Sequence, residues 1–323
     1  MIFPELYKEY EKYLNDELRS YEQDSLLQPI AYIMHLPAKR IRAVLVLLGY
    51  NLVKPDIQSA LPIAHAYELF HNFTLMHDDI MDEAATRRGQ PSTHSKFGLN
   101  SAILSGDALM VIAFQYLQQN LDPAMSPKIW KHFNSLALEV CQGQQMDLDF
   151  EAKARVSKEE YIEMIRLKTA VFLGHALRAG VIKAGGADSL ADSLYQYGES
   201  LGIAFQIQDD YLDLYGNATE TGKQKGGDIL RKKKSYPVSA FFAKASNQHI
   251  ADFSNIYTSY TTDEAIVEAA INLFSYYDIA GETKSEVARL YSLATASLDA
   301  CDLSPDKKDR LDVLKSWLQG RNK

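Results

Sequence analysis

This sequence of 323 residues has only two cysteines, Cys141 and Cys301, and no apolar run long enough to cross a membrane. Two cysteines are too few for a disulfide framework and indicate a reducing compartment. A membrane-spanning helix needs about 20 consecutive apolar residues, so none is expected. The segment from Met1 to Tyr21 is charged throughout and does not resemble a signal peptide. We therefore expect a cytoplasmic protein without a membrane span.

Glycine and proline are also few, at 17 and 10 residues, and long stretches contain neither. Together with 46% apolar residues, this composition predicts an all-α protein with a large core. No change of composition marks a boundary, so we expect one domain over 1–323. An excess of positive charge is lacking as well. The formal net charge is −8, which argues against binding to nucleic acid.

Hydrophobic periodicity predicts most of the helices. The expected ranges are about 4–21, 38–53, 101–119, 128–149, 188–215, 239–245, 262–274, 280–299 and 304–318. Another long helix begins at about Asp56. A further one opens at Ser157, with Glu160 completing a capping box, and ends before Gly185-Gly186.

An acidic motif of the form DDxxD occurs twice, as Asp78, Asp79 and Asp82 and again as Asp209, Asp210 and Asp213. Each copy lies in apolar, helix-favouring sequence, so its first and last acids share a helix face. Like charges at this spacing repel, and no base on the same face neutralises them. Such carboxylates suit a hard cation such as Mg2+, which is usually held together with substrate phosphates. The sequence therefore predicts a site for metal and phosphate.

Basic residues follow each acidic motif. Arg87 and Arg88 follow the first motif in a predicted loop, 86–91. A glycine-rich basic loop, 221–228, follows the second, with Lys233 shortly after it. The glycines indicate a mobile lid, and arginine pairs well with phosphate oxygens. We interpret this repeated order as a site for a metal–diphosphate complex rather than as surface ion pairs, which contribute little.

Three further basic side chains lie in predicted helices. Lys39 and Arg42 are three residues apart at the start of the helix expected from Ala38, so they would share a face, while Arg40 would point elsewhere. Because this helix is otherwise apolar, we interpret the pair as an anion site. Lys168 has apolar neighbours and either reaches solvent along its stem or serves a polar cavity.

Together these residues resemble the trans-isoprenyl diphosphate synthases, the polyprenyl synthetase family, from about Lys39 to Pro237. The resemblance implies a bundle of long helices around a deep central cavity, in which the two motifs face each other and bind three Mg2+ ions. By position, Asp78, Asp82 and Asp209 resemble metal ligands, whereas Asp79, Asp210 and Asp213 resemble ligands or their supporting partners. The residues that resemble allylic diphosphate contacts are Arg87, Lys168, Thr169, Gln206, Lys223 and Lys233. Those that resemble the isopentenyl diphosphate site are Lys39, Arg42, His71 and Arg88. Gln144 and Asp147 match a G-Q-x-x-D element that lines the cavity.

The reaction implied by the resemblance is head-to-tail prenyl transfer. Diphosphate leaves the allylic substrate, the double bond of isopentenyl diphosphate attacks the resulting cation, and a proton is lost. Asp78, Asp82, Arg87, Lys168, Asp209 and Lys223 would act directly in this catalysis. The resemblance also implies a homodimer. One departure is Pro37-Ala38, where the family commonly has two glycines, and the first motif lacks the two-residue insertion of the bacterial farnesyl type.

Product length would depend on the helix before the first motif. Phe73 and Thr74 lie five and four residues before Asp78, and Phe70 lies eight before it. In the family, a large ring five residues before the motif forms the floor of the product tunnel. We therefore expect a short product, geranylgeranyl diphosphate first and farnesyl diphosphate second, with Phe73 as the floor.

Three other interpretations remain open from the sequence. A class I terpene cyclase shares the fold and first motif, but usually has an Asn/Ser/Glu triad at the second. A di-iron carboxylate bundle needs Glu-x-x-His pairs on two helices, and the sequence does not contain two such pairs. A non-catalytic partner subunit usually loses one acidic motif, whereas this chain keeps both.

Overall fold

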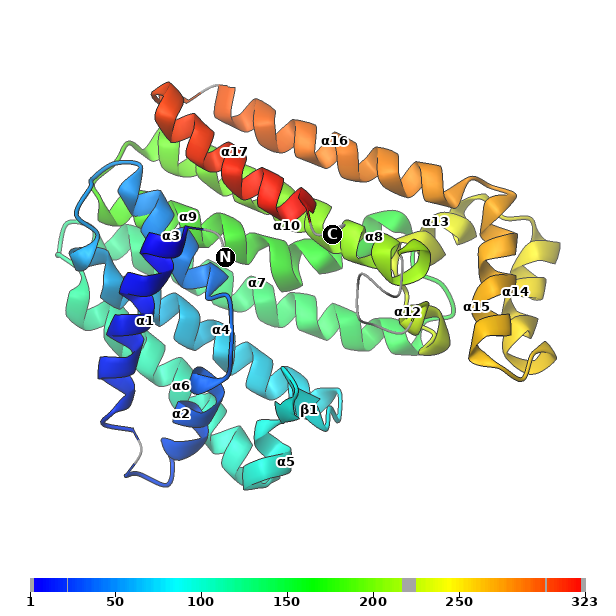
Figure 1. Ribbon diagram of the computed structural model, residues 1–323, viewed down its shortest axis with the longest axis horizontal. Helices are drawn as coiled ribbons and strands as arrows, with labels where there is room; N and C mark the ends of the chain where they lie inside the picture. The colour runs from blue at the N-terminus through cyan, green and yellow to red at the C-terminus, as the bar shows by residue number, and fades with distance from the viewer. Residues whose placement is uncertain (1–2, 22, 217–224, 300, 321–323) are drawn as a thin grey trace. The chain divides into compact units, whose positions relative to one another are not determined.

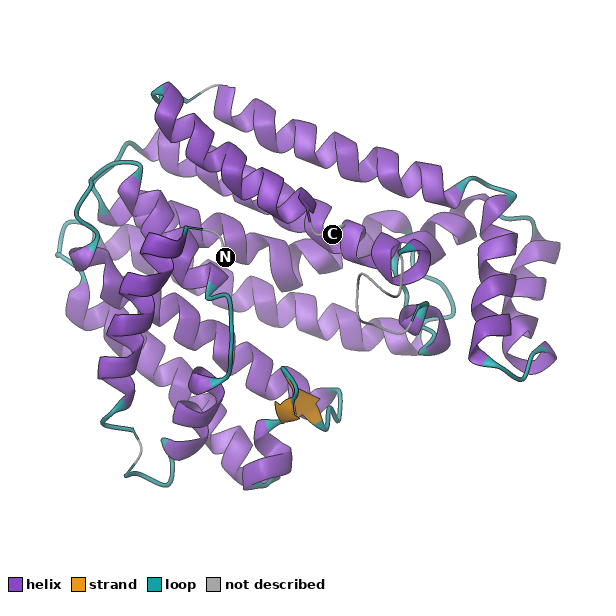
Figure 2. Ribbon diagram, in the orientation of Figure 1, coloured by secondary structure: helices purple, strands orange, loops and turns teal. Residues whose placement is uncertain are grey.

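The computed structural model describes residues 3–21, 23–216, 225–299 and 301–320. Figure 2 shows that almost all regular structure in these residues is helical, with one small pair of strands. The helices up to the first acidic motif are α1 (Pro4–Leu18), α2 (Gln28–His35), α3 (Ile41–Asn51), the short 3-10 helix η1 (Gln58–Ala60) and α4 (Leu61–Met81). The hairpin strands β1 (Thr86–Arg87) and β2 (Gln90–Pro91) follow, then α5 (Thr93–Phe97), α6 (Leu99–Asn120) and α7 (Ser126–Ala152). Next come α8 (Lys158–Ile165), the π-helical turn η2 (Arg166–Ala170), α9 (Val171–Lys183) and α10 (Asp188–Tyr215). The last elements are α12 (Gly227–Leu230), α13 (Tyr236–Lys244), α14 (Asn247–Ser259), α15 (Asp263–Ser275), α16 (Ile279–Asp299) and α17 (Pro305–Gln319).

The chain divides into two compact units. Unit 1 comprises Met1–Phe133 and His175–Leu194, and unit 2 comprises Asn134–Gly174 and Tyr195–Lys323. The first acidic motif belongs to unit 1 and the second belongs to unit 2. Each unit therefore carries one acidic motif and is described by itself.

In unit 1, α4 packs against α6 and α3, so that the helix with the first motif is held on two sides (Figure 1). A second close contact joins α3 to α9 through glycines. A Cβ at Gly49 would lie 2.2 Å from the carbonyl oxygen of Leu177, and one at Gly180 would lie 2.0 Å from that of Val46. Only glycine lets the two helix backbones approach so closely.

In unit 2, the helix with the second motif is supported by the last two helices, α16 and α17 (Figure 1). The buried Tyr197 hydroxyl donates to the carbonyl oxygen of Leu311 at 2.5 Å. Because Tyr197 lies on α10 and Leu311 on α17, this bond ties the two helices together. The C-terminal helices, in which the sequence shows no motif, thus support α10.

Most expected helices are present, and α10 has the expected bounds. The capping box at Ser157 is confirmed: its hydroxyl accepts from the N–H of Glu160, and the Glu160 carboxylate accepts from the N–H of Ser157. Other expectations were wrong. The helix expected from Ala38 begins at Ile41, the one expected from about Asp56 begins at Leu61, and the loop expected for 86–91 contains a β-hairpin. The helices α2, α5, α12 and α14 were not anticipated. Among the described residues, no helix combines the length and hydrophobicity that a membrane span requires.

Candidate active site

The first acidic motif lies at the C-terminal end of α4. Asp78 is in the last turn, and Asp82 is the residue that caps the helix, its N–H donating to the carbonyl oxygen of Asp78 at 2.9 Å. The negative end of a helix dipole is an unfavourable place for carboxylates, and this last turn contains no basic residue. A cation bound at Asp78 and Asp82 would therefore stabilise this end of the helix.

Arg87 of the β-hairpin balances part of this charge. The hairpin itself was not expected from the sequence. Arg87 donates from Nε to Oδ1 of Asp79 at 2.9 Å, and its Nη2 lies 3.4 Å from Oδ2 of Asp78. Asp79 is fully buried, and its Oδ2 has no hydrogen-bond partner among the described residues. Asp79 thus positions Arg87 beside Asp78, while Asp78 stays partly accessible.

The hairpin explains how two consecutive arginines reach the motif. Thr86 pairs with Pro91 and Arg87 with Gln90, so Arg88 and Gly89 form a two-residue turn. Both have positive φ, at 54° and 75°, as a type I′ turn requires. Asparagine is usual at the first of these positions, and a left-handed arginine is strained. The hairpin thus places Arg88 at its tip and Arg87 in the adjoining strand, where Arg87 contacts Asp79 and Asp78 of α4.

The arginines surround a neutral histidine on α4. Burial and then the charges of Arg42, Arg88 and Arg87 hold the pKa of His71 well below its usual value. Burial also lowers the pKa of Arg88, and its buried Nη1 has no hydrogen-bond partner among the described residues. Three guanidinium groups around an uncharged ring form a strong site for an anion.

The basic residues before α3 differ from the expectation. Because α3 begins at Ile41, Lys39 precedes the helix and is exposed, and the argument that it shares a helix face with Arg42 was wrong. Arg40 has a φ of 48° and is buried; its Nε donates to Glu11 at 2.8 Å and its Nη2 to the carbonyl oxygen of Met34 at 2.5 Å. Arg40 therefore stabilises unit 1, as its expected direction away from the site implied.

Three aromatic rings line α4 on the N-terminal side of the first motif. Phe70 and Phe73 have ring centroids 5.5 Å apart, and Phe73 lies 4.8 Å from His77. His77 in turn fits against Gly106 of α6, where a Cβ would lie 2.2 Å from its Nε2. Both rings are buried, Phe70 fully and Phe73 at 9% exposure. The hydroxyl of Thr74, beside Phe73, donates to the carbonyl oxygen of His71 at 2.7 Å.

The second motif lines a polar cavity of about 550 Å3 in unit 2. Its lining comprises Gln206, Asp209, Asp210, Asp213, Gly227, Asp228, Arg231 and Lys233. An adjoining cavity of about 160 Å3 shares four of these residues and adds Asp147, Tyr161, Met164, Ile165, Lys168, Thr169, Lys234 and Ser235. Acids and lysines around one space are a suitable lining for a metal ion and a diphosphate together.

The three acids of this motif have different surroundings. The N–H of Asp228 donates to Oδ2 of Asp213 at 3.0 Å, so Asp213 holds the start of α12. Oδ2 of Asp210 accepts from the Tyr161 hydroxyl at 2.5 Å and from the N–H of Tyr236 at 2.8 Å. Burial raises the pKa of Asp210 to about 8, although both hydrogen bonds favour its charged form. Asp210 and Asp213 thus hold neighbouring segments, as the supporting partners of a metal ligand would.

Lys168 and Thr169 are presented by the π-helical turn between α8 and α9. Single π turns often lie at functional sites. The Lys168 ammonium donates to Oδ2 of Asp147 at 2.7 Å. Gly143 of α7 lies against this turn, where a Cβ would be 2.2 Å from the backbone nitrogen of Lys168. Within the G-Q-x-x-D element, Gly143 therefore allows α7 to approach the π turn closely, and Asp147 orients Lys168.

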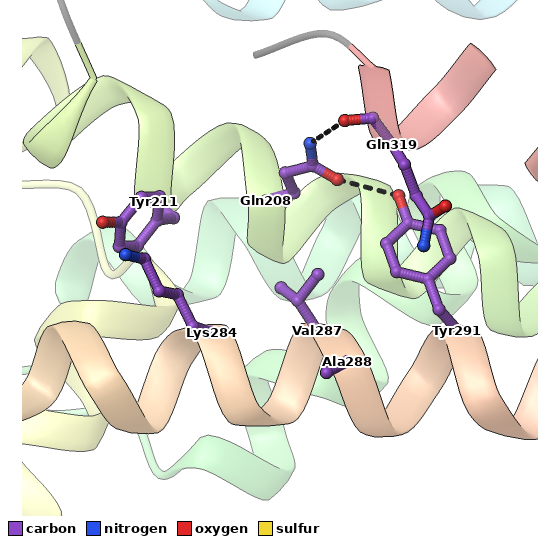
Figure 3. Close-up of a pocket in the computed structure, with 7 residues that line it drawn as sticks. All are labelled: Gln208, Tyr211, Lys284, Val287, Ala288, Tyr291 and Gln319. Atoms are coloured by element: carbon purple, nitrogen blue, oxygen red, sulfur yellow. Dashed lines mark hydrogen bonds between the residues drawn. The ribbon is translucent and has the colours of Figure 1, made fainter. Parts of the chain in front are cut away.

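A third pocket, of about 300 Å3, lies among α10, α16 and α17 and is mainly apolar. Figure 3 shows Gln208 between the other helices, donating to the carbonyl oxygen of Gln319 and accepting from the Tyr291 hydroxyl. None of the described residues that line this pocket is acidic. It therefore differs in chemistry from the two cavities at the second motif.

The structure brings the expected residues together within each unit, with exceptions. Lys223 lies outside the described residues. Sequence analysis missed Asp228 and Lys234, which line the cavities of unit 2, and missed the supporting role of Tyr161. For Asp228 a signal existed, because an acid directly after Gly226-Gly227 in a basic loop is unusual.

Among the described residues, no three histidine, cysteine, aspartate or glutamate side chains form a preassembled metal site. This agrees with the chemistry of Mg2+, which is usually held by one or two carboxylates and completed by water and substrate phosphates.

An all-α scaffold with acids at a helix end, clustered arginines and a cavity lined by acids and lysines is typical of metal-dependent enzymes that act on diphosphates. The sequence profile of polyprenyl synthetases matches residues 23–274. The chain is 35% identical over 302 residues to a short chain isoprenyl diphosphate synthase of Methanothermobacter thermautotrophicus, covering 94% of this chain and 88% of that one.

Two solved structures are similar over almost the whole chain. Geranylgeranyl pyrophosphate synthetase from Pyrococcus horikoshii gives a TM-score of 0.89 at 30% identity, covering 98% of each chain. Geranylgeranyl pyrophosphate synthase from Corynebacterium glutamicum, complexed with isoprenyl diphosphate and magnesium, gives 0.86 at 25% identity, covering 99% of this chain and 100% of that one. The chain belongs to the polyprenyl synthetase family. It is a transferase, a short-chain prenyltransferase with the all-α isoprenoid synthase fold.

Proposed function

We propose that the enzyme condenses isopentenyl diphosphate head-to-tail with an allylic diphosphate and makes an all-trans prenyl diphosphate. The observation that carries this proposal is that each unit has its own set of basic side chains near a DDxxD motif. Two sets suit a reaction with two diphosphate substrates. The C. glutamicum relative, which is complexed with isoprenyl diphosphate and magnesium, supports the substrate class.

Unit 1 would bind isopentenyl diphosphate. Arg42, Arg88 and the neutral His71 would form its centre, and Lys39 would add a cation at the exposed edge. The buried Nη1 of Arg88 supplies a donor that a phosphate oxygen would satisfy. Because Pro37-Ala38 stands where the family commonly has two glycines, side chains rather than a glycine backbone would bind the diphosphate here.

Unit 2 would bind the allylic diphosphate through Lys168, Thr169, Gln206 and Lys233, which line its cavities. Arg87 would leave part of its contact with Asp78 to bind the same group. The lysine and arginine charges stabilise the diphosphate as the carbon–oxygen bond breaks. The double bond of isopentenyl diphosphate then attacks the allylic cation, and a proton leaves the adduct to the released diphosphate. Lys223 would add a further cation.

We propose that three Mg2+ ions serve the reaction, with Asp78, Asp82 and Asp209 as their protein ligands. The acids at the negative end of α4 and the acid-lined cavity of unit 2 fit this group. Bound Mg2+ neutralises the charge that develops on the leaving diphosphate. Asp79, Asp210 and Asp213 would orient Arg87 and the segments at α12 and α13.

The product proposed is geranylgeranyl diphosphate, with farnesyl diphosphate second. Both structural relatives described above bear the name of a geranylgeranyl diphosphate synthase. On this chain, Phe73 lies one turn and more before Asp78, and its ring packs against that of Phe70, with centroids 5.5 Å apart. Phe73 would therefore stop the growing chain, with the smaller Thr74 beside it.

We also propose a cytoplasmic homodimer in which both units form one synthase domain. The family profile includes residues of both units, which supports a single functional domain. On α6, Leu104 and Val111 are 59% and 52% exposed and share one face. Such a stripe suits a helix face covered by a second copy. Sedimentation of Leu104→Glu should then show monomers, with the wild type as a dimer.

The decisive test is product analysis. The purified protein, Mg2+, labelled isopentenyl diphosphate and one allylic primer at a time should give geranylgeranyl diphosphate by chromatography. Asp78→Ala and Asp209→Ala should each lose turnover by orders of magnitude, with unchanged helical circular dichroism. Near-normal turnover in both variants would refute the metal assignment. Release of diphosphate from a prenyl substrate alone would instead indicate a cyclase.

A further inference from the structure

One carboxylate oxygen in unit 2 joins three segments of the chain. Oδ2 of Asp210, on α10, accepts the Tyr161 hydroxyl of α8 at 2.5 Å and the N–H of Tyr236, at the start of α13, at 2.8 Å. The rings of Tyr161 and Tyr236 also pack edge to face, with centroids 6.4 Å apart. Both tyrosines are buried.

Each joined segment carries a side chain of the proposed allylic diphosphate site. Asp209 precedes Asp210 on α10, Lys168 is seven residues after Tyr161 in the π turn, and Lys233 is three residues before Tyr236. All three line the cavities around Asp210. The position of each of these three charged side chains therefore depends on a segment that is held at Oδ2 of Asp210.

We infer that Tyr161 is a positioning residue for the allylic diphosphate site and acts through Asp210. Its hydroxyl fixes α8 and the π turn relative to α10. A 1 Å error in the placement of a binding group is enough to reduce turnover strongly. This inference rests on the proposed function, because it assigns Lys168 and Lys233 to the allylic substrate.

Tyr161→Phe removes the hydroxyl and keeps the ring. The matched control is Tyr236→Phe, which removes the same atom from the other ring of the pair but keeps the N–H that donates to Asp210. Tyr161→Phe should raise KM for the allylic diphosphate about tenfold, the effect expected for the loss of one hydrogen bond. KM for isopentenyl diphosphate should stay unchanged, and Tyr236→Phe should leave both constants unchanged.

A double-mutant cycle separates an effect through Asp210 from direct contact with substrate. If Tyr161 acts through Asp210, then Asp210→Asn with Tyr161→Phe should be no worse than Asp210→Asn alone. Additive losses, equal constants in the two phenylalanine variants, or equal rises in KM for both substrates would each overturn the inference. An inactive wild type would refute the proposed function instead, so the two failures are distinguishable.

Discussion

Gly143→Ala tests whether the close contact between α7 and the π turn is needed for activity. A Cβ at this position would lie 2.2 Å from the nitrogen of Lys168, 2.7 Å from its Cα and 2.7 Å from the carbonyl carbon of Leu167. These neighbours are backbone atoms, so no rotamer change removes the clash. The helix and the turn must separate by about 1 Å before the contact becomes ordinary.

Two effects on stability oppose each other. Alanine in place of glycine favours a helix by about 1 kcal/mol, and overpacking costs about 1–3 kcal/mol. The free energy of unfolding should therefore fall by at most about 2 kcal/mol. Activity should suffer more, because Lys168 and its bond to Asp147 move with the turn. A displacement of about 1 Å in a binding group costs roughly 100-fold in rate.

The assay compares thermal unfolding, followed by circular dichroism, with the rate of label incorporation from isopentenyl diphosphate. Gly320→Ala is the control, because a Cβ there meets nothing within 4 Å and φ is −75°. Gly143→Ala should unfold a few degrees lower and lose most activity, while Gly320→Ala should match the wild type. Equal activity in the two variants would show that the close contact does not position Lys168.

Three further predictions concern unit 1. Arg42→Ala should raise KM for isopentenyl diphosphate selectively, and an equal rise for the allylic substrate would argue against separate sites. Phe73→Ala should lengthen the product by at least one isoprene unit on chromatography; unchanged products would place the floor elsewhere. Burial holds the pKa of His65 at about 3, so this histidine must take up a proton on unfolding and stability should fall as pH drops below 6.5. Its contribution is about 2 kcal/mol at pH 5, and denaturant titrations of His65→Gln should show a correspondingly shallower loss between pH 7 and 5.

The elements that could be predicted from sequence are those with strong local signals. The bounds of α10 follow from long apolar periodicity between Asp188 and Gly216, and the start of α8 follows from the capping box at Ser157. By contrast, α14 was not anticipated, although Ser246 caps its start by accepting from the N–H of His249.

The errors in unit 1 come from backbone conformations that side-chain patterns do not reveal. Arg40 has a left-handed φ and ends the coil before α3, so Lys39 lies outside the helix. The hairpin was missed because its turn is Arg88-Gly89, whereas the usual signal is Asn-Gly or Asp-Gly. In both places an arginine takes a strained backbone conformation. Arg40 binds the carboxylate of Glu11, and Arg88 lies in the cluster of arginines around His71. Tertiary contacts, rather than local preference, determine these turns.

The two DDxxD motifs are identical in sequence pattern, yet the structure gives their central acids different partners. Asp79 is buried and holds an arginine side chain, which belongs to the hairpin eight residues later. Asp210 instead holds a tyrosine hydroxyl and a backbone N–H from segments 49 residues before and 26 after it. In a helix, the second acid of the motif points about 100° away from the first, so it faces neighbouring chain rather than the position of the other two. The spacing therefore separates two faces: the first and last acids of each motif share one face of the helix, and the middle acid fixes the bases or segments around it. Sequence reveals the shared spacing, but only the packing around Asp79 and Asp210 determines which partner each one holds.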